Sequence, residues 1–497
     1  ILKQFEELPD QQLSPDPWAI IAYAWAKAYA DPSIGMNDLI QKVEQVLVCM
    51  EEDAEKQHLT SHLAAIRAYL AWMKGEAELA LELVQHGLEN LPEEDWAARV
   101  HLLNIKGLAL QYRGNFLEAT QSFEEALAAG HMIGRMHEIL YTSSNLAYAN
   151  MLQGHLHEAF SLCQAAICQA EETGQSSQKF PVLAHAYATR SIIQLEWNEL
   201  ESAAASARYG VTLAEQWGQA DALHFALTCF SIILGAAGEF EEALAVNQRA
   251  MQVARTISTW YIRISAENEI MLLLAKGDVL GAANKFTGYW LTSEDDRKHE
   301  PQLVIVTLLY RLNLFPDVVN LLEPLHDDFK QKGWNQLWIK LMPFYALSLQ
   351  ALGRKEDALE VLERCLAAAE PEGYMRVFIE RSTPMASLLS DLRSRGVKTE
   401  YITKLLEAFR LPEEAATPRP EDTTLLRSAC ANLIEPLSER ELEVLRLLNS
   451  HLSVPEIASE MLIAPSTLRT HIRKIFLKLD VHGRLEALQK AQQLGML

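Results

Sequence analysis

The chain has 497 residues, of which 49% are hydrophobic and 22% are charged, so the sequence predicts a folded protein with several domains or one long repeat array. Its formal net charge is −22 at pH 7, and such an acidic surface repels DNA except where a basic part of the chain stands apart. No apolar run approaches the ~20 residues that cross a bilayer, so we predict no membrane segment.

The N-terminus begins at Ile1 and lacks both an initiator Met and the basic and apolar layout of a secretory signal. We therefore expect a fragment of a longer, cytoplasmic protein. The six cysteines show no Cys-x-x-Cys pair and no Cys/His spacing that suits zinc. They predict small core residues in a reducing compartment and no metal site: Cys49, Cys163, Cys168, Cys229, Cys365 and Cys430.

A period near forty residues follows a first, degenerate unit at 17–50. Stretches such as "KGEAELA" (74–80), "RGNFLEA" (113–119) and "AGEFEEA" (237–243) superimpose without gaps, and each predicts a helix–turn–helix junction. Their last residues, the anchors, are 39, 40, 44, 40, 39, 36 and 40 positions apart. The anchors are Ala80, Ala119, Ala159, Ala203, Ala243, Ala282, Val318 and Ala358.

In the clearest unit, five residues occupy the small, turn, small, large and small positions of a tetratricopeptide repeat: Gly107, Gly114, Ala119, Phe123 and Ala126. Small residues let two helices approach closely, and the large residue fills the gap between neighbouring units. The pattern resembles the tetratricopeptide family, with most units longer than its usual ~34 residues. We therefore predict an all-α chain whose larger part is a helical superhelix.

Aromatic residues cluster late in the array, where the period is least regular. Most large aromatic side chains in such an array serve as packing core, and a minority line the concave face. We keep five as candidates for a surface that binds an effector or a partner: Trp260, Tyr261, Trp290, Trp334 and Trp338. Packing core is the alternative interpretation for each of them.

After Ala369 the repeat pattern ends, and "LPEEAATPRPEDTT" (411–424) brings prolines and carboxylates at a density that cannot bury a core. We predict a helical repeat domain at 1–400, a linker at 401–435 and a separate terminal domain at 436–497. Only the terminal domain escapes the acidity of the chain, because it holds eight Lys and Arg residues against seven Asp and Glu residues.

The first two helices predicted in the terminal domain each open with a Ser three residues before a Glu, at Ser438 and Ser453, which is the capping-box pattern. The third predicted helix follows Pro465, and the faces outside its apolar stripe are basic. Its apolar stripe consists of Leu468, Ile472, Ile475 and Leu479. A capped helix, a tight turn and a basic helix form the helix-turn-helix arrangement, whose width suits the major groove of DNA.

The stretch 436–497 resembles the four-helix LuxR-type helix-turn-helix domain in the elements "LSERELEVL", "EIA" and "TLRTHIRKIFLKL". In that family the third helix enters the major groove, so the resemblance implies base contacts from Arg469, Thr470 and Arg473. It also implies phosphate contacts from Thr467, His471, Lys474 and Lys478.

The fourth helix of LuxR-type domains often pairs two domains on a two-fold DNA site. One interpretation of Leu485, Leu488 and Ala491 is therefore a homodimer on double-stranded DNA, and the other is completion of the domain core.

The array, the segment "EGYMRVFIERSTPMASLL" (372–389) and the terminal domain together resemble the large MalT-like bacterial regulators of the LuxR family. Such regulators normally carry an N-terminal nucleotide-binding domain, but this sequence has no Gly-x-x-x-x-Gly-Lys-Ser/Thr loop. We therefore expect no cofactor in this chain, with ATP possible only through an N-terminal domain that it lacks.

The leading hypothesis is a transcription regulator in which the array senses a small-molecule effector or a protein partner and controls the DNA-binding domain. The alternative is a protein-interaction scaffold whose terminal domain serves assembly rather than specific DNA binding. An enzyme is disfavoured, because the sequence has neither a Gly-x-Ser-x-Gly nor a His-Glu-x-x-His motif.

Overall fold

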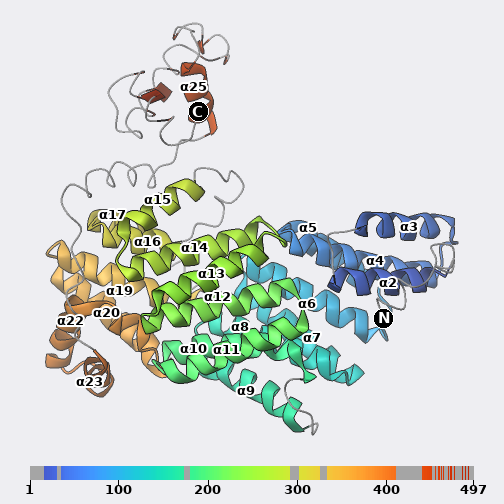
Figure 1. Cartoon of the computed structure of the whole chain (residues 1–497), viewed down its shortest axis with the longest axis horizontal. Helices are drawn as coiled ribbons and strands as arrows, with labels where there is room; N and C mark the ends of the chain where they lie inside the picture. The colour runs from blue at the N-terminus through green and yellow to red at the C-terminus, as the bar shows by residue number, and fades with distance from the viewer. Residues whose placement is uncertain are drawn as a thin grey trace. The chain divides into compact units, whose positions relative to one another are not determined.

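The computed structural model of the chain describes residues 16–30, 35–172, 179–290, 302–324, 333–409 and 439–449, with individual positions between 454 and 491. Every regular element in these residues is a helix (Figure 1), which confirms the all-α prediction. The residues form two compact units. The first consists of 1–265, 324–343 and 359–410, and the second of 266–323, 344–358 and 411–497.

Helices α2 to α13 of the first unit stack in the order of the sequence (Figure 1). Helices α2 and α3 form the degenerate first repeat that the sequence predicts at 17–50. The bounds of these helices are α2 Pro17–Ala30, α3 Met36–Cys49, α4 Ala54–Met73, α5 Ala77–Glu89, α6 Trp96–Tyr112, α7 Phe116–Ile133, α8 Met136–Leu152, α9 Leu156–Glu172, α10 Ala184–Glu196, α11 Leu200–Trp217, α12 Ala220–Ala237 and α13 Phe240–Ala254.

The later helices continue the repeat and then depart from it. Their bounds are α14 Thr259–Lys276, α15 Val279–Trp290, α16 Gln302–Arg311, α17 Phe315–Leu322, α19 Asn335–Ala351, α20 Lys355–Ala369, α21 Arg376–Ile379, α22 Ser382–Ser394, α23 Thr399–Ala408 and α25 Glu439–Leu448. Short 3-10 turns lie at Pro181–Leu183 and Glu370–Glu372.

Each predicted helix junction is a tight turn built on one residue in the left-handed conformation. The second residue of the seven-residue stretch has a positive φ in all eight units: Gly75, Gly114, Gly154, Asn198, Gly238, Gly277, Asn313 and Gly353. The next residue donates its N–H to a carbonyl five residues back, as Asn115 does to Leu110 O at 2.9 Å. This is the Schellman arrangement, which satisfies free carbonyls at a helix end.

The anchor residues lie where the two helices of a unit pack together, and all eight are 0% exposed. Gly107 shows why small residues are needed on the facing helix. A Cβ there would lie 2.5 Å from the ring of Phe123, which is itself fully buried. The predicted pairing of a small and a large residue is therefore confirmed in this unit.

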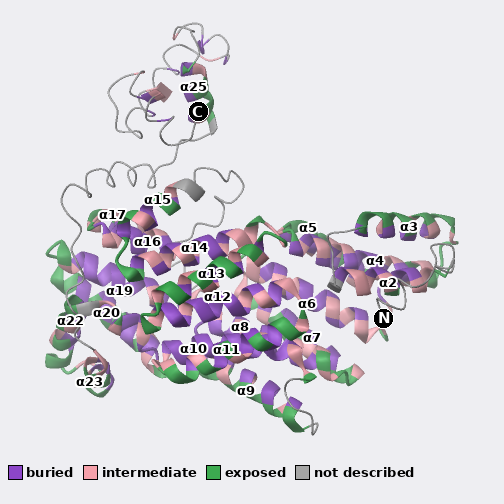
Figure 2. Ribbon diagram, in the orientation of Figure 1, coloured by how far each residue is buried: buried purple, intermediate pink, exposed green. Residues whose placement is uncertain are grey.

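The two helices of each unit differ in burial (Figure 2). The second helices, α5, α7, α9, α11 and α13, bury one face: α13 buries Ala243, Asn247, Ala250 and Ala254. The first helices, α4, α6, α8, α10 and α12, are buried over most of their surface, and α8 buries every residue from Thr142 to Ala147. Their enclosed polar side chains bond to one another, since Asn104 Nδ2 donates to Thr142 Oγ1 at 2.8 Å.

Helix α12 is long and apolar enough to cross a membrane, and no other helix in the described part of the chain passes that test. It packs against α10, α11 and α13, and 67% of it is buried. The hydroxyl of Ser231 donates to the carbonyl of Thr228 at 2.9 Å in its middle. We interpret α12 as an interior helix of the array.

Two late segments of the first unit, residues 333–340 and 370–380, lie against the turns of earlier repeats, and we call them the closing segments. The indole Nε1 of Trp334 donates to the carbonyl of Gly114 at 2.6 Å. The ammonium of Lys340 lies 2.8 Å from Glu196 Oε1. The N–H of Met375 donates to the carbonyl of Glu196 at 2.8 Å.

Arg376 makes the most extensive of these contacts. Its Nη1 donates to Asn198 Oδ1 at 3.1 Å, and its Nη2 donates to the carbonyl of Ala236 at 2.6 Å. The side chain therefore ties two successive helix junctions together. The indole of Trp197, one residue before Asn198, donates in turn to the carbonyl of Glu372 at 2.8 Å.

The helical region extends past residue 400, where the sequence analysis placed the start of the linker. Helix α23 packs on α22 and buries Tyr401, Ile402 and Leu405. The Tyr401 hydroxyl donates to the carbonyl of Tyr374. Residues 401–408 therefore belong to the first unit, because their apolar face has a partner. The rest of the predicted linker, from residue 410, lies outside the described residues.

The cysteine prediction holds for three of the six residues. Cys163, Cys229 and Cys365 are buried, and burial raises the pKa of the Cys163 and Cys229 thiols to about 12. Cys49 and Cys168 are exposed, so the prediction of core residues is wrong for these two. They lie outside the buried stripes of α3 and α9. Cys430 lies outside the described residues.

Candidate functional site

The terminal domain is built on α25 and a small apolar core. Two arginines bond its backbone: Arg440 Nη2 donates to the Met461 carbonyl at 3.0 Å, and Arg484 Nε donates to the Leu448 carbonyl at 2.9 Å. These two arginine side chains therefore link separate segments of the terminal domain to each other. The core consists of Val444, Leu445, Leu448, Ile457, Ala458, Met461, Leu468, Ile475, Ala487 and Ala491.

The predicted DNA-contacting helix buries the stripe expected from its sequence. Leu468 and Ile475 are 0% exposed, and Ile472 packs against the same core. Leu479, the fourth position of the stripe, lies outside the described residues. Burial at these three positions fixes which side of the segment faces the domain.

Of the seven predicted DNA contacts, His471 is in the described part of the chain. Its ring is half-buried, and its Nδ1 is enclosed without a hydrogen-bond partner among the described residues. The other six contacts stay predictions, because they lie outside the described residues: Thr467, Arg469, Thr470, Arg473, Lys474 and Lys478.

The two interpretations of the fourth helix now differ in support. Ala491 is fully buried in the domain core, and Leu488 packs against that core. Both residues therefore serve the domain itself, and Ala491 has no surface to offer a second copy. Leu485 lies outside the described residues.

The first helices of the array carry a row of partly exposed side chains on otherwise buried surfaces. His62, His101, Tyr141, His185 and Phe225 each precede the anchor of their unit by eighteen residues, and each is partly exposed. We call these five residues the aromatic row. The ring centroids of Tyr141 and His185 are 6.2 Å apart, and those of His185 and Phe225 are 5.2 Å apart in a stacked arrangement.

Burial shifts the pKa values of ionisable groups at the middle of the row in the direction that favours their neutral forms. Burial lowers the pKa of His185 to about 4, and its Nε2 has no hydrogen-bond partner among the described residues. Burial raises the pKa of Asp221. Burial, with the charge of Asp221 as a second cause, also raises the pKa of Tyr141 and Tyr261. The row therefore combines ring faces with enclosed hydrogen-bonding groups, which is the chemistry of a small-molecule or peptide site.

Two of the predicted aromatic candidates contact rings on the first helices of the array. Tyr261 lies edge-on to the ring of His224, with centroids 5.1 Å apart. Trp260 lies 4.3 Å from the ring of Tyr112, and the Arg263 guanidinium lies 4.3 Å above the Trp260 ring. Both side chains are half-exposed.

The other three aromatic candidates have different surroundings. Trp334 belongs to a closing segment and bonds to Gly114. Trp338 is 1% exposed, so it is part of the packing core and offers no surface to a partner. The side chain of Trp290 lies outside the described residues.

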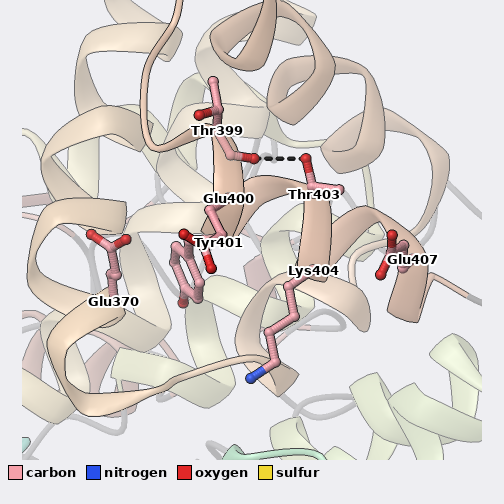
Figure 3. A pocket seen from close by; sticks show the side chains of 7 residues that line it. All are labelled: Glu370, Thr399, Glu400, Tyr401, Thr403, Lys404 and Glu407. Carbon is pink, nitrogen blue, oxygen red and sulfur yellow. Dashed lines mark hydrogen bonds between the residues drawn. The ribbon is translucent and has the colours of Figure 1, made fainter.

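A hollow of about 730 Å³ near the end of the first unit is a weaker candidate (Figure 3). It is lined by Glu370, Thr399, Glu400, Tyr401, Thr403, Lys404 and Glu407. Several lining groups are already engaged: Thr403 Oγ1 donates to the carbonyl of Thr399 at 2.6 Å, and Glu370 pairs with Lys398. Its charged lining consists of three carboxylates and the ammonium of Lys404, with no convergent set of donors among the described residues, so we assign it no role.

Sequence reasoning missed the aromatic row and the closing segments. The signal for the row was present in the repeat alignment, because a ring-bearing residue stands at the same position of five successive units. The signal was hard to see because the residue type changes from His to Tyr to Phe. No local pattern marks the closing segments, whose partners lie far away in the sequence.

Comparison with known proteins agrees with this architecture. The family described as "MalT-like TPR region" matches residues 61–395, and "Bacterial regulatory proteins, luxR family" matches residues 435–491. Both are regulatory rather than enzymatic families.

One solved structure shows a similar fold for the array. A Rap protein complexed with competence and sporulation factor aligns with a TM-score of 0.55 at 13% identity, over 72% of this chain and 98% of that one. The apo form of the quorum sensor NprR from B. thuringiensis aligns with a TM-score of 0.40 at 14% identity, over 74% of this chain and 90% of that one. The family match covers more than half of the chain, which therefore belongs to the MalT-like TPR regulators with a C-terminal luxR-family domain.

Proposed function

We propose that this regulator binds double-stranded DNA through its terminal domain, and that an effector bound on the aromatic row controls this binding. The observation that carries the proposal is the row itself: five partly exposed rings stand at one repeat position on helices that are otherwise buried. Packing alone would favour aliphatic side chains there, since an imidazole such as His185 is enclosed without a partner for its Nε2 among the described residues.

The fold supports the effector part of the proposal. The similar Rap protein was crystallised with a bound factor, competence and sporulation factor. The enclosed carboxyl of Asp221 and the hydroxyl of Tyr141 would provide hydrogen bonds, and His185 and Phe225 would provide ring faces. We therefore expect a small polar molecule or a short peptide.

The luxR-family match and the charge distribution support the DNA part. An acidic chain that keeps a basic helix at its end directs DNA to that helix. If about six basic groups contact phosphates, the logarithm of the binding constant should fall with the logarithm of the salt concentration with a slope of about −5.

The DNA test is selection from a random duplex pool at two salt concentrations. The wild type is compared with Arg469→Ala/Arg473→Ala, and with Arg255→Ala/Arg393→Ala as a control that removes two exposed arginines from the array. We expect the wild type and the control to enrich one sequence and the helix variant to lose it. If the wild type and both variants bind a protein partner equally and none of them enriches a DNA sequence, the result would favour the scaffold alternative.

The effector test is a thermal-shift screen of metabolites and short peptides with the full chain. A hit should lose its shift in Tyr141→Leu and His185→Leu, and keep it in His131→Leu, which changes an exposed histidine on α7. The hit should also change the DNA affinity of the wild type. If a ligand still shifts the melting temperature of both Tyr141→Leu and His185→Leu, the effector binds outside the aromatic row.

A further inference from the structure

Three side chains of the first unit converge near the start of the array. The imidazoles of His58 and His62 lie one turn apart on α4, so they share one face of the helix. Their Nε2 atoms lie 2.5 Å and 2.8 Å from the same oxygen, Oδ2 of Asp95. All three ligand atoms lie within 4.8 Å of one another.

The carboxylate of this cluster is held in place by its own helix. Asp95 is the N-cap of α6, and its Oδ1 accepts the N–H of Ala98 at 2.9 Å. This bond leaves Oδ2 to face the imidazoles. An ordinary aspartate side chain is ionised at neutral pH, so Oδ2 is available as a carboxylate ligand.

The imidazoles are also held by packing. The ring of Trp18 on α2 lies edge-on to both, with centroids 4.7 Å from His58 and 5.3 Å from His62. Trp18 is fixed in turn by its Nε1, which donates to Glu55 Oε1 at 3.2 Å. The side chains of His58, His62 and Asp95 are 27%, 16% and 14% exposed, so the cluster is sheltered but open to an ion from solvent.

We propose that His58, His62 and Asp95 bind a divalent transition-metal ion of the zinc class. Two imidazole nitrogens and one carboxylate oxygen form a common set of three protein ligands for zinc, with water as the fourth. Zinc bonds of about 2.0–2.2 Å need the ligand atoms slightly farther apart than their present hydrogen bonds. Imidazole ligands favour such ions over Mg²⁺ and Ca²⁺, which prefer oxygen atoms.

The position of the site gives the ion a structural role. His62 is the first residue of the aromatic row, so the ion would lie at one end of that surface. It would also join α4 to the start of α6, beneath a side chain of α2. The sequence signal is His-x-x-x-His on one helix face, which a search of cysteine spacing alone does not detect.

The test measures metal binding by the full chain after removal of metals with a chelator. Exposed thiols also bind zinc, so the background carries Cys49→Ser and Cys168→Ser, together with Cys430→Ser. Zinc is titrated by calorimetry at pH 7.5, and cobalt is titrated in parallel because its visible spectrum reports the number and type of ligands. We expect one ion per chain and a cobalt spectrum typical of nitrogen and oxygen ligands.

Three ligand variants are compared with one control. His58→Gln, His62→Gln and Asp95→Asn should each weaken binding at least about tenfold, since even removal of outer-shell partners costs 10- to 100-fold. Asn is as good an N-cap as Asp, so Asp95→Asn removes the charge and keeps the start of α6. His86→Gln changes an exposed histidine on α5 and should leave binding unchanged.

The proposal fails if the background protein takes up no ion, or if Asp95→Asn binds as tightly as the background. A lower melting temperature in Asp95→Asn with no stoichiometric metal binding would assign the cluster to hydrogen bonding alone. Circular dichroism of each variant identifies a loss of binding that is due to unfolding. The outcome does not depend on the DNA or effector tests, because the readout is metal binding itself.

Discussion

The turns of the first unit and those of the second unit have the same local structure and different surroundings. Gly114 and Gly353 have nearly equal φ angles of 79° and 80° at the same position of the repeat. A Cβ at Gly114 would lie 2.5 Å from the Trp334 ring, whereas one at Gly353 would meet no heavy atom of the described chain within 4 Å. Local sequence therefore determines the turn, and distant residues determine how much a change in it costs.

The largest contrast is expected between Gly114→Ala and Gly353→Ala. The left-handed backbone alone costs a non-glycine residue about 1–2 kcal/mol, and crowding against Trp334 adds about 1–3 kcal/mol. We expect Gly114→Ala to destabilise the protein by about 4 kcal/mol and Gly353→Ala by about 1–2 kcal/mol. Urea unfolding followed by circular dichroism measures both. Equal losses in the free energy of unfolding would show that the closing segment moves away from the added methyl group without destabilising the protein.

Removing the Trp334 side chain should come next. Trp334→Ala deletes the packing on Gly114 and Phe116 and the indole hydrogen bond, for an expected loss of about 3 kcal/mol. In this background Gly114→Ala should cost only as much as Gly353→Ala, because the crowding has gone. Hydrogen exchange at residues 113–117 provides a local readout. A change in exchange confined to α19 would contradict the contact.

Arg376→Ala should have an intermediate effect. It removes donors to Asn198 Oδ1 and the Ala236 carbonyl, and hydrogen bonds from charged groups are worth about 1.5–3 kcal/mol. We expect a loss of about 2 kcal/mol and faster exchange at both junctions. Arg354→Ala is the matched control, since Arg354 follows the open turn at Gly353 and pairs with exposed Asp357. Its loss of stability should be much smaller than that of Arg376→Ala, because exposed ion pairs contribute little.

The smallest contrast concerns the two turns that use asparagine. Asn313→Gly relaxes a positive φ on an exposed turn and should change stability by less than about 0.5 kcal/mol. Asn198→Gly relaxes a similar φ but removes the oxygen that accepts from Arg376. We expect it to lose about 1 kcal/mol relative to Asn313→Gly. Thermal melting of the pair tests this, and identical melting temperatures would mean that the Arg376 contact with Asn198 contributes nothing.

The repeat array was predictable because its information is periodic. The spacing of the anchors identified buried contacts that the structure confirms at all eight positions. The turns followed from Gly or Asn at one position, and the core of the terminal domain followed from the apolar stripe that includes Leu468 and Ile475. Within one repeat, each of these features depends on residues a few positions apart, and helical geometry converts such spacing into spatial proximity.

The closing segments were not predictable in this way. Trp334 and Gly114 are 220 residues apart, and neither sequence neighbourhood indicates which distant segment it contacts. The same reason hid the metal-ligand set, since Asp95 lies 33 residues beyond His62. Trp338 was kept as a surface candidate because its spacing does not show which side of α19 is buried. Contacts of this kind depend on the curvature of the whole array rather than on any local pattern.

The closing segments also have a consequence for how the protein reaches its native state. A repeat array whose units touch only their neighbours can start folding anywhere and propagate. Here the carbonyl of Gly114 gains its partner only when Trp334 has been made. The N–H of His157 likewise gains its partner only with Glu372, 215 residues later. During synthesis the early repeats leave the ribosome with these turns uncovered, and long-range contacts slow the final step. The repeats assemble in order, but the protein completes its fold only after residue 376 has been made.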